Sequence, residues 1–158
     1  LRERLRDDPN RQPEAGQLHT APAKMLSKLQ LELRYLTMDA RIALEKLSVH
    51  PASIPEGLAT ALDVEAHLEE FERRGWLTYR QCWRFAHESV RRILHEGLQP
   101  GRRSRTHGRA AAYFAASGHA AAEAYHRLHA GEVVDWQRLA QQLGAVPLVA
   151  TPTHKGRQ

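Results

Sequence analysis

Hydrophobic residues recur at helical spacing from the first third of the chain onward. The clearest early stripe falls at positions i, i+3, i+7 and i+10, occupied by Leu26, Leu29, Leu33 and Leu36. This spacing predicts an amphipathic helix over 24–36. A second helix is predicted to begin beside Thr37 or Asp39, either of which can cap it. It should end near His50, because Pro51 disfavours helical geometry in the residue before it.

Two shorter helices are predicted next. Residues 53–56 read Ser-Ile-Pro-Glu, which has the spacing of a capping box and predicts a helix that begins at Ser53. Asp63 is predicted to cap the following helix, which places Leu68 and Phe71 on its inner face. Gly75 should end that helix, since glycine readily adopts the left-handed conformation found just after a helix.

The pattern changes from a helical to a two-residue period between Trp76 and Phe85. Leu77 and Tyr79 alternate with polar residues, and so do Trp83 and Phe85. Alternation of this kind predicts a small β-hairpin over 76–85. The turn contains neither Gly nor Asn, so the pattern leaves its type open.

Helical periodicity returns at Val90 and stops at the Pro100-Gly101 pair. Two alanine-rich helices are predicted after it, over 103–116 and 119–129, followed by a short helix that closes at Gly144. The fold class predicted from this order is all-α: a winged helix-turn-helix with a small β-hairpin, followed by a TPR-like helical hairpin. The predicted parts are a charged helix end and linker (1–23), a winged-helix domain (24–99), the helical hairpin with a short helix (100–144) and a flexible tail (145–158).

The inner faces of these elements predict one shared core. Nine residues are expected to be buried together in it: Leu44, Leu47, Leu58, Leu68, Phe71, Leu77, Phe85, Val90 and Leu94.

Composition bears on the cellular location of the chain and on its partners. The 158 residues carry a net charge of +5 and a single cysteine, Cys82. A lone thiol cannot form an internal disulfide, which favours a cytoplasmic location, and no apolar run approaches the roughly 20 residues needed to span a membrane. The first residue is Leu rather than Met, from which we expect an excised piece of a longer protein.

The basic total permits binding to nucleic acid, but the local charges oppose it. The first half of the helix predicted after Asp63 carries Glu65, Glu69 and Glu70. In a winged helix this half would face the DNA, where carboxylates are repelled by phosphates. The charge pattern therefore predicts only weak, non-specific and salt-sensitive binding to nucleic acid.

Four stretches together carry a resemblance to a known family. They are residues 22–49, 63–77, 83–90 (Trp-Arg-Phe-Ala-His-Glu-Ser-Val) and 102–107 with 125–128. In their order and spacing they resemble the segment that follows the nucleotide-binding core in STAND-type signalling ATPases, in particular large LuxR-type bacterial regulators. The resemblance covers about residues 22–130.

The resemblance implies a regulatory, non-catalytic module that relays nucleotide state to a sensor or effector, with transcription control as an output. It implies that His87 faces the nucleotide phosphates and distinguishes ADP from ATP. No G-x-x-x-x-G-K-[ST] loop occurs in the chain, so ATP or ADP is expected in a domain preceding Leu1, with a helical-repeat domain following. Alternatively, His87 caps a helix or packs under the hairpin.

Other candidate sites are weaker. Arg102, Arg103 and Arg105, with His107, could contact phosphate, although a solvated helix face near a loop is the better explanation of such a run. For metal, the histidines at 119, 126 and 129 lack the H-E-x-x-H pattern and are expected to be exposed, so no metal site is predicted. No catalytic residue is predicted either. The alternative function is that of a DNA-binding winged-helix transcriptional regulator.

Overall fold

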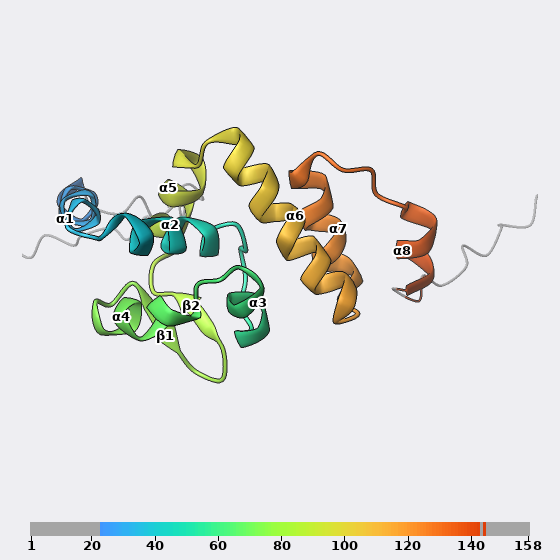
Figure 1. The fold of residues 1–158 in the computed structure, drawn as a ribbon, viewed down its shortest axis with the longest axis horizontal. Coiled ribbons are helices and arrows are strands. Elements are labelled where there is room, and N and C mark those ends of the chain that lie inside the picture. The colour runs from blue at the N-terminus through green and yellow to red at the C-terminus, as the bar shows by residue number, and fades with distance from the viewer. Residues whose placement is uncertain (1–22, 143, 145–158) are drawn as a thin grey trace, which may run out of the picture.

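The computed structural model describes residues 23–142 and 144. It is mostly helical with one small antiparallel sheet, as predicted (Figure 1). The elements in chain order are α1 (Ala23–Arg34), α2 (Met38–Leu47), α3 (Glu56–Ala61), the 3₁₀ helix η1 (Glu65–His67), α4 (Leu68–Arg73), β1 (Leu77–Tyr79), β2 (Trp83–Phe85), α5 (Glu88–Gly97), α6 (Pro100–Ala116), α7 (Ala120–Ala130) and α8 (Trp136–Gln142). Of the charged helix end and linker predicted over 1–23, all but Ala23, which begins α1, lies outside the described residues, as does the tail predicted over 145–158.

Several helix ends follow their capping residues. The Thr37 hydroxyl accepts a hydrogen bond from the Ala40 amide at 3.2 Å and caps α2, as predicted. Helix α4 ends at a left-handed Gly75 (φ +72°), and the Trp76 amide donates back to the Phe71 carbonyl at 2.8 Å. Helix α6 begins at Pro100, three residues before the predicted start, because proline suits the first position of a helix.

Two predicted helix caps are wrong. Helix α3 begins at Glu56 rather than Ser53, and the residue before it, Pro55, makes no side-chain cap. Ile54 instead pairs with Trp83, with amide–carbonyl distances of 2.7 and 3.1 Å, and adds an isolated bridge beside the hairpin. Asp63 has φ +54° and no capping role, since its carboxylate accepts a hydrogen bond from Arg109 on α6 at 2.7 Å.

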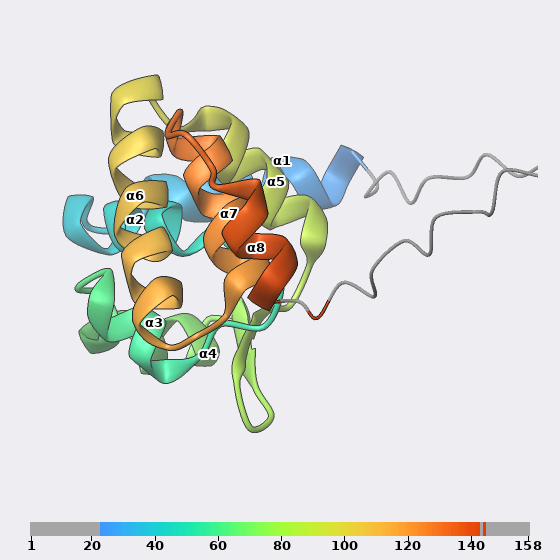
Figure 2. The same ribbon diagram turned by 90° about the vertical axis from the view of Figure 1, so that its right-hand side faces the viewer.

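The hairpin lies where the two-residue period predicted it. Leu77 pairs with Phe85 and Tyr79 with Trp83, in antiparallel register. The turn between the strands places Gln81 in the left-handed region (φ +67°), a conformation usually taken by Gly or Asn. The turn between the strands contains none of the residues usual at such a position, yet the hairpin forms. Figure 2 shows the hairpin projecting from the helices.

The predicted core is confirmed. Eight of its nine members are buried in one cluster, and Phe85 is half-buried against it. The cluster is centred on α2, α3 and α4, where Leu44, Leu58 and Phe71 are fully buried. Ala110 and Phe114 of α6 also belong to it, so the core continues into the helical hairpin.

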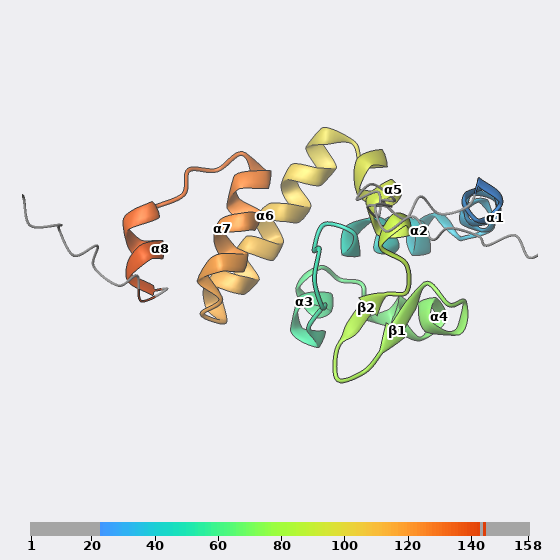
Figure 3. The ribbon, with the colours of Figure 1, turned by 180° about the vertical axis from the view of Figure 1, so that it is seen from behind.

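Helices α6 and α7 form a hairpin beside the first five helices. They pack along their length, and Figure 3 shows them side by side with α8 lying beyond α7. Small side chains, among them Ala111, Ala120 and Ala124, are buried in this hairpin and let its helices approach closely. No helix within 23–142 is long and apolar enough to cross a membrane.

Candidate functional site: an exposed helix N-terminus and a chain of buried histidines

His87 lies where the chain passes from β2 into α5. It is the N-cap residue of α5, its side chain is exposed and makes no capping hydrogen bond, and its carbonyl accepts from the Val90 amide at 3.1 Å. A helix N-terminus presents free amide donors and a partial positive charge, both of which favour an anion. The imidazole is therefore beside a surface that can receive a phosphate group.

The arginines at the start of α6 are directed toward neighbouring helices. Arg102 forms an ion pair with Glu45 of α2 at 3.0 Å, and Arg103 donates to the carbonyls of Glu96 and Leu98 at 3.2 and 3.0 Å. Arg105 is exposed. These contacts tie α6 to α2 and to the end of α5, and phosphate binding by the three arginines stays a prediction.

His107 does not share a surface patch with these arginines, and that part of the prediction is wrong. Its side chain is fully buried. Ala110, Ala111 and Phe114 follow it on α6 at i+3, i+4 and i+7, which places all four on the inner face of the helix. That spacing was the available indication that this histidine is buried.

Four histidine rings form a continuous chain through the junction between the hairpin and the preceding helices. His50 Nδ1 lies 3.0 Å from His126 Nε2, and His126 Nδ1 lies 2.9 Å from His107 Nδ1. His107 Nε2 in turn lies 3.3 Å from His95 Nε2. We call His50, His126, His107 and His95 the histidine chain, which joins the end of α2 to α7, α6 and α5.

Aromatic packing holds these rings in place. Phe114 stacks on His126 with 5.4 Å between ring centroids and an interplanar angle of 11°, and its centroid lies 5.0 Å from that of His50. His129 stacks on His107 at 5.0 Å. His126 is fully buried, so its predicted exposure is wrong, whereas His119 and His129 are exposed as predicted.

Burial keeps the chain neutral. Desolvation lowers the pKa of His50 to about 4 and the pKa values of His107 and His126 to about 3. Burial also lowers the pKa of His95, and the nearby Arg103 adds to this effect. Near pH 7 every ring in the histidine chain therefore carries one proton on one of its two nitrogens.

The backbone of Ser53 sets the direction of the chain. The backbone of Ser53 acts to raise the pKa of His50, as a carbonyl beside a ring N–H does, and since Nδ1 of His50 faces His126, Nε2 is the nitrogen left to face Ser53. His50 Nδ1 must then accept from His126, which in turn accepts from His107, which accepts from His95. One consistent set of tautomers satisfies every contact.

The histidine nitrogens follow one another in a line and do not converge on a point. Within the described part of the chain, no group of three or more His, Cys, Asp or Glu side chains is placed to hold a metal ion. The chemistry that this arrangement offers is the acceptance and passage of protons.

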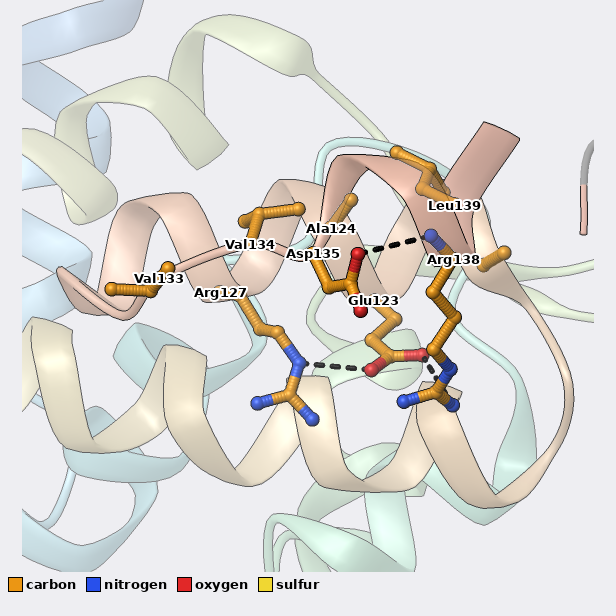
Figure 4. Close-up of a pocket in the computed structure, with 9 residues that line it drawn as sticks. Glu123, Ala124, Arg127, Val133, Val134, Asp135, Arg138 and Leu139 are labelled. Atoms are coloured by element: carbon orange, nitrogen blue, oxygen red, sulfur yellow. Dashed lines mark hydrogen bonds and ion pairs between the residues drawn. The ribbon is translucent and has the colours of Figure 1, made fainter. Parts of the chain in front are cut away.

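A separate pocket of about 250 Å³ lies between α7 and α8 (Figure 4). At its base the nearly buried Glu123 accepts a hydrogen bond from Arg127 at 2.8 Å, and Arg138 approaches it from α8 at 3.9 Å. Asp135 caps α8 by accepting from the Gln137 amide at 3.1 Å. Of these contacts, the Arg138–Glu123 ion pair is the one that joins α8 to α7.

Comparison with known protein families, with characterised proteins and with solved structures found no match to this chain.

Proposed function

We propose that this chain is a regulatory, non-catalytic signal-relay module of a STAND-type signalling ATPase, with a cytoplasmic location. In this proposal it couples the nucleotide state of a preceding nucleotide-binding domain to a following helical-repeat sensor or effector. Transcription control is the proposed output, and ATP or ADP is bound by the preceding domain rather than by this module.

The order of elements supports a winged-helix assignment for the first part. Helix α2, the bridge at Ile54, helices α3 and α4, and the β1–β2 hairpin follow one another as in a winged helix-turn-helix. The α6–α7 pair is then the first unit of a TPR-like array. Exposed apolar side chains on α7 and in the segment that follows it into α8, Leu128, Val133 and Trp136, suit stacking of a further helical unit.

The observation that carries the proposal is the position of His87. Its exposed ring stands at the N-terminus of a ten-residue helix, where an imidazole N–H and backbone amides can donate to the same phosphate. A hydrogen bond to a charged group contributes about 1.5–3 kcal/mol. That is enough to bias a two-state switch about ten-fold or more.

Helix α5 is also tied to the elements that would have to move. Arg91 donates to the Ser48 carbonyl at the end of α2 at 2.8 Å, and His95 contacts His107 of α6. Arg103 of α6 donates hydrogen bonds to the Glu96 and Leu98 carbonyls at the C-terminal end of α5. A displacement of α5 would therefore strain or shift its hydrogen bonds to both α2 and the α6–α7 hairpin.

This proposal predicts the behaviour of a His87→Ala variant of the intact protein. We expect ADP release to accelerate about ten-fold, because the variant lacks one charged hydrogen bond to the nucleotide. Release of a fluorescent ADP analogue, followed by stopped flow, measures this. His119→Ala is the matched control, since His119 is also an exposed N-cap histidine, at the start of α7.

The second measurement of this test is the thermal stability of the 158-residue chain. His87→Ala should leave its thermal midpoint almost unchanged, because the side chain makes no capping hydrogen bond. Unchanged ADP release together with a large loss of stability would mean that His87 has a structural role alone, and the sensing proposal would be withdrawn.

A DNA-binding winged-helix regulator is the second candidate function. Exposed Arg80 and Arg84 on the β-hairpin favour it, since a basic wing suits a phosphate backbone. Against it, Glu65, Glu69 and Glu72 are exposed on η1 and α4, the segment that would enter the major groove.

We therefore expect only weak binding to duplex DNA, equal for unrelated sequences and lost steeply as salt is raised. Fluorescence anisotropy with several labelled duplexes at two salt concentrations measures this. Sequence-specific binding that disappears in a Glu65→Ala or His67→Ala variant would contradict the expectation and favour the DNA-binding function.

A further inference from the structure

The histidine chain obeys a counting rule. Nitrogens 2.9–3.3 Å apart form a hydrogen bond only when one of the two carries a proton and the other offers a lone pair. Each of the three contacts therefore holds one proton. The fourth proton of the four neutral rings lies on a terminal nitrogen of the chain, and the Ser53 backbone favours Nε2 of His50 for it.

The histidine chain can accept only one further proton while its three contacts are kept. The nitrogen without an assigned contact is Nδ1 of His95, and this ring is half-exposed at the end of the chain. A proton added anywhere can be passed along by tautomer shifts until the excess reaches this nitrogen. A second added proton has no such nitrogen left, so it places two N–H groups face to face across a contact of about 3 Å.

The surroundings do little to neutralise added charge. Two cations act on the chain, and both oppose its protonation: Arg91 beside His50 and Arg103 beside His95 and His107. The charged and titratable groups that act on these rings from the packed elements are Arg91 and Glu96 of α5, Arg103 of α6 and His129 of α7, with Tyr125 of α7 packed against His107. The carboxylate among them, Glu96, acts on His95 at one end of the chain, and Glu88 is paired with Arg91.

The location of these contacts determines which interface is affected. Each contact lies between different elements, and together they join the hairpin helices to α5 and the end of α2. The core around Leu44, Leu58 and Phe71 contains apolar side chains and no histidine of the chain. Ala110 and Phe114 of α6 reach into this core, so release of the hairpin would expose that edge of it, whereas the part formed by α2 to α4 has no histidine contact to lose. Added protons therefore weaken the contacts of the hairpin with α5 and with the segment after α2.

We propose that the histidine chain is a proton-operated latch, which holds the α6–α7 hairpin against α2 and α5 at neutral pH and releases it when a second proton enters. Once the interface opens, all four rings meet water and each takes up a proton with the ordinary histidine pKa of about 6.5. The open state thus holds three to four more protons than the closed state, and they bind as a coupled set.

The sign of the effect follows from this count. The latch is fully closed above about pH 6.5 and loses stability as pH falls below that value, because the open state binds more protons. Well below pH 6.5 the equilibrium constant for opening should rise about a thousand- to ten-thousand-fold per pH unit, since each of the three to four additional protons contributes a factor of about ten.

Hydrogen exchange of the 158-residue chain between pH 7.5 and 4.5 tests this proposal. Protection factors, corrected for the intrinsic pH dependence of exchange, should fall for amides of α6 and α7 while those of α2 to α4 are retained. Imidazole NMR signals should show His107 and His126 neutral until that opening occurs. An equal loss of protection in both regions would overturn the proposal, since it would indicate ordinary acid unfolding.

A His126→Gln variant separates the latch from other acid effects. Glutamine retains a donor and an acceptor but takes up no proton, so the pH dependence of opening should become about ten-fold less steep per pH unit. If this variant is too unstable at neutral pH, His107→Gln serves the same purpose. His119→Gln, outside the chain, should keep the full dependence; equal slopes for all variants would overturn the proposal.

Discussion

Replacing Phe71 with alanine should lower the free energy of unfolding by about 3–5 kcal/mol. The side chain is fully buried in α4, at the centre of the cluster that also contains Leu44 and Leu58. The substitution removes the apolar contacts of the ring and leaves a cavity. The surrounding helices can fill this cavity only in part, because each is held in place by other contacts. Urea unfolding followed by tryptophan fluorescence measures the change.

Tyr35→Ala is the control for this prediction, since the Tyr35 side chain is 74% exposed. It should change stability by less than about 0.5 kcal/mol. A cost near zero for Phe71→Ala would show that this face of α4 points to solvent and that the described core is wrong.

Replacing His126 with alanine should cost about as much, roughly 3–5 kcal/mol at pH 7.5. The ring is fully buried, stacks on Phe114 and lies within hydrogen-bonding distance of both His50 and His107. The substitution removes the ring and also leaves the facing nitrogens of His50 and His107 without a partner in the interior.

The exposed His119, on the same hairpin, provides the comparison. His119→Ala should change stability by less than about 0.5 kcal/mol in the same urea titration. Equal, small effects of the two substitutions would contradict the burial of His126 and the existence of a histidine chain.

The sequence predicted the parts of the fold that depend on periodicity. The core positions recur at spacings that belong to one helix face or one strand face, and burial follows directly from them. The hairpin was predictable for the same reason, although its turn was not. Gln81 takes a left-handed conformation that its residue type does not favour, so no local pattern marks it.

Tertiary contacts overrode the local capping patterns. The 53–56 segment has the spacing of a capping box, but Ile54 is drawn into pairing with Trp83, so α3 begins later. Asp63 was a plausible cap whose carboxylate instead reaches Arg109, 46 positions further on. Such partners are distant in the sequence, and local reasoning cannot include them.

The two candidate sites, His87 and the histidine chain, also differ in how far the sequence predicted them. The place of His87 at the strand-to-helix passage was predictable, because one strand pattern ends and one helical pattern begins there. The histidine chain was not, since its members come from three helices and the segment after α2, and His50 and His126 lie 76 positions apart. Only the spacing of His107 relative to Phe114 indicated that a histidine belongs inside.

The claim that nucleotide state is relayed through α5 to the helical hairpin is tested most directly by a distance measurement in the intact protein. Spin labels would be placed on Cys82, at the turn of the β-hairpin, and on a cysteine introduced by Ala116→Cys at the exposed end of α6. The account predicts different label–label distance distributions with ADP and with an ATP analogue, and a smaller difference in the His87→Ala variant. Identical distributions in the two nucleotide states would contradict it.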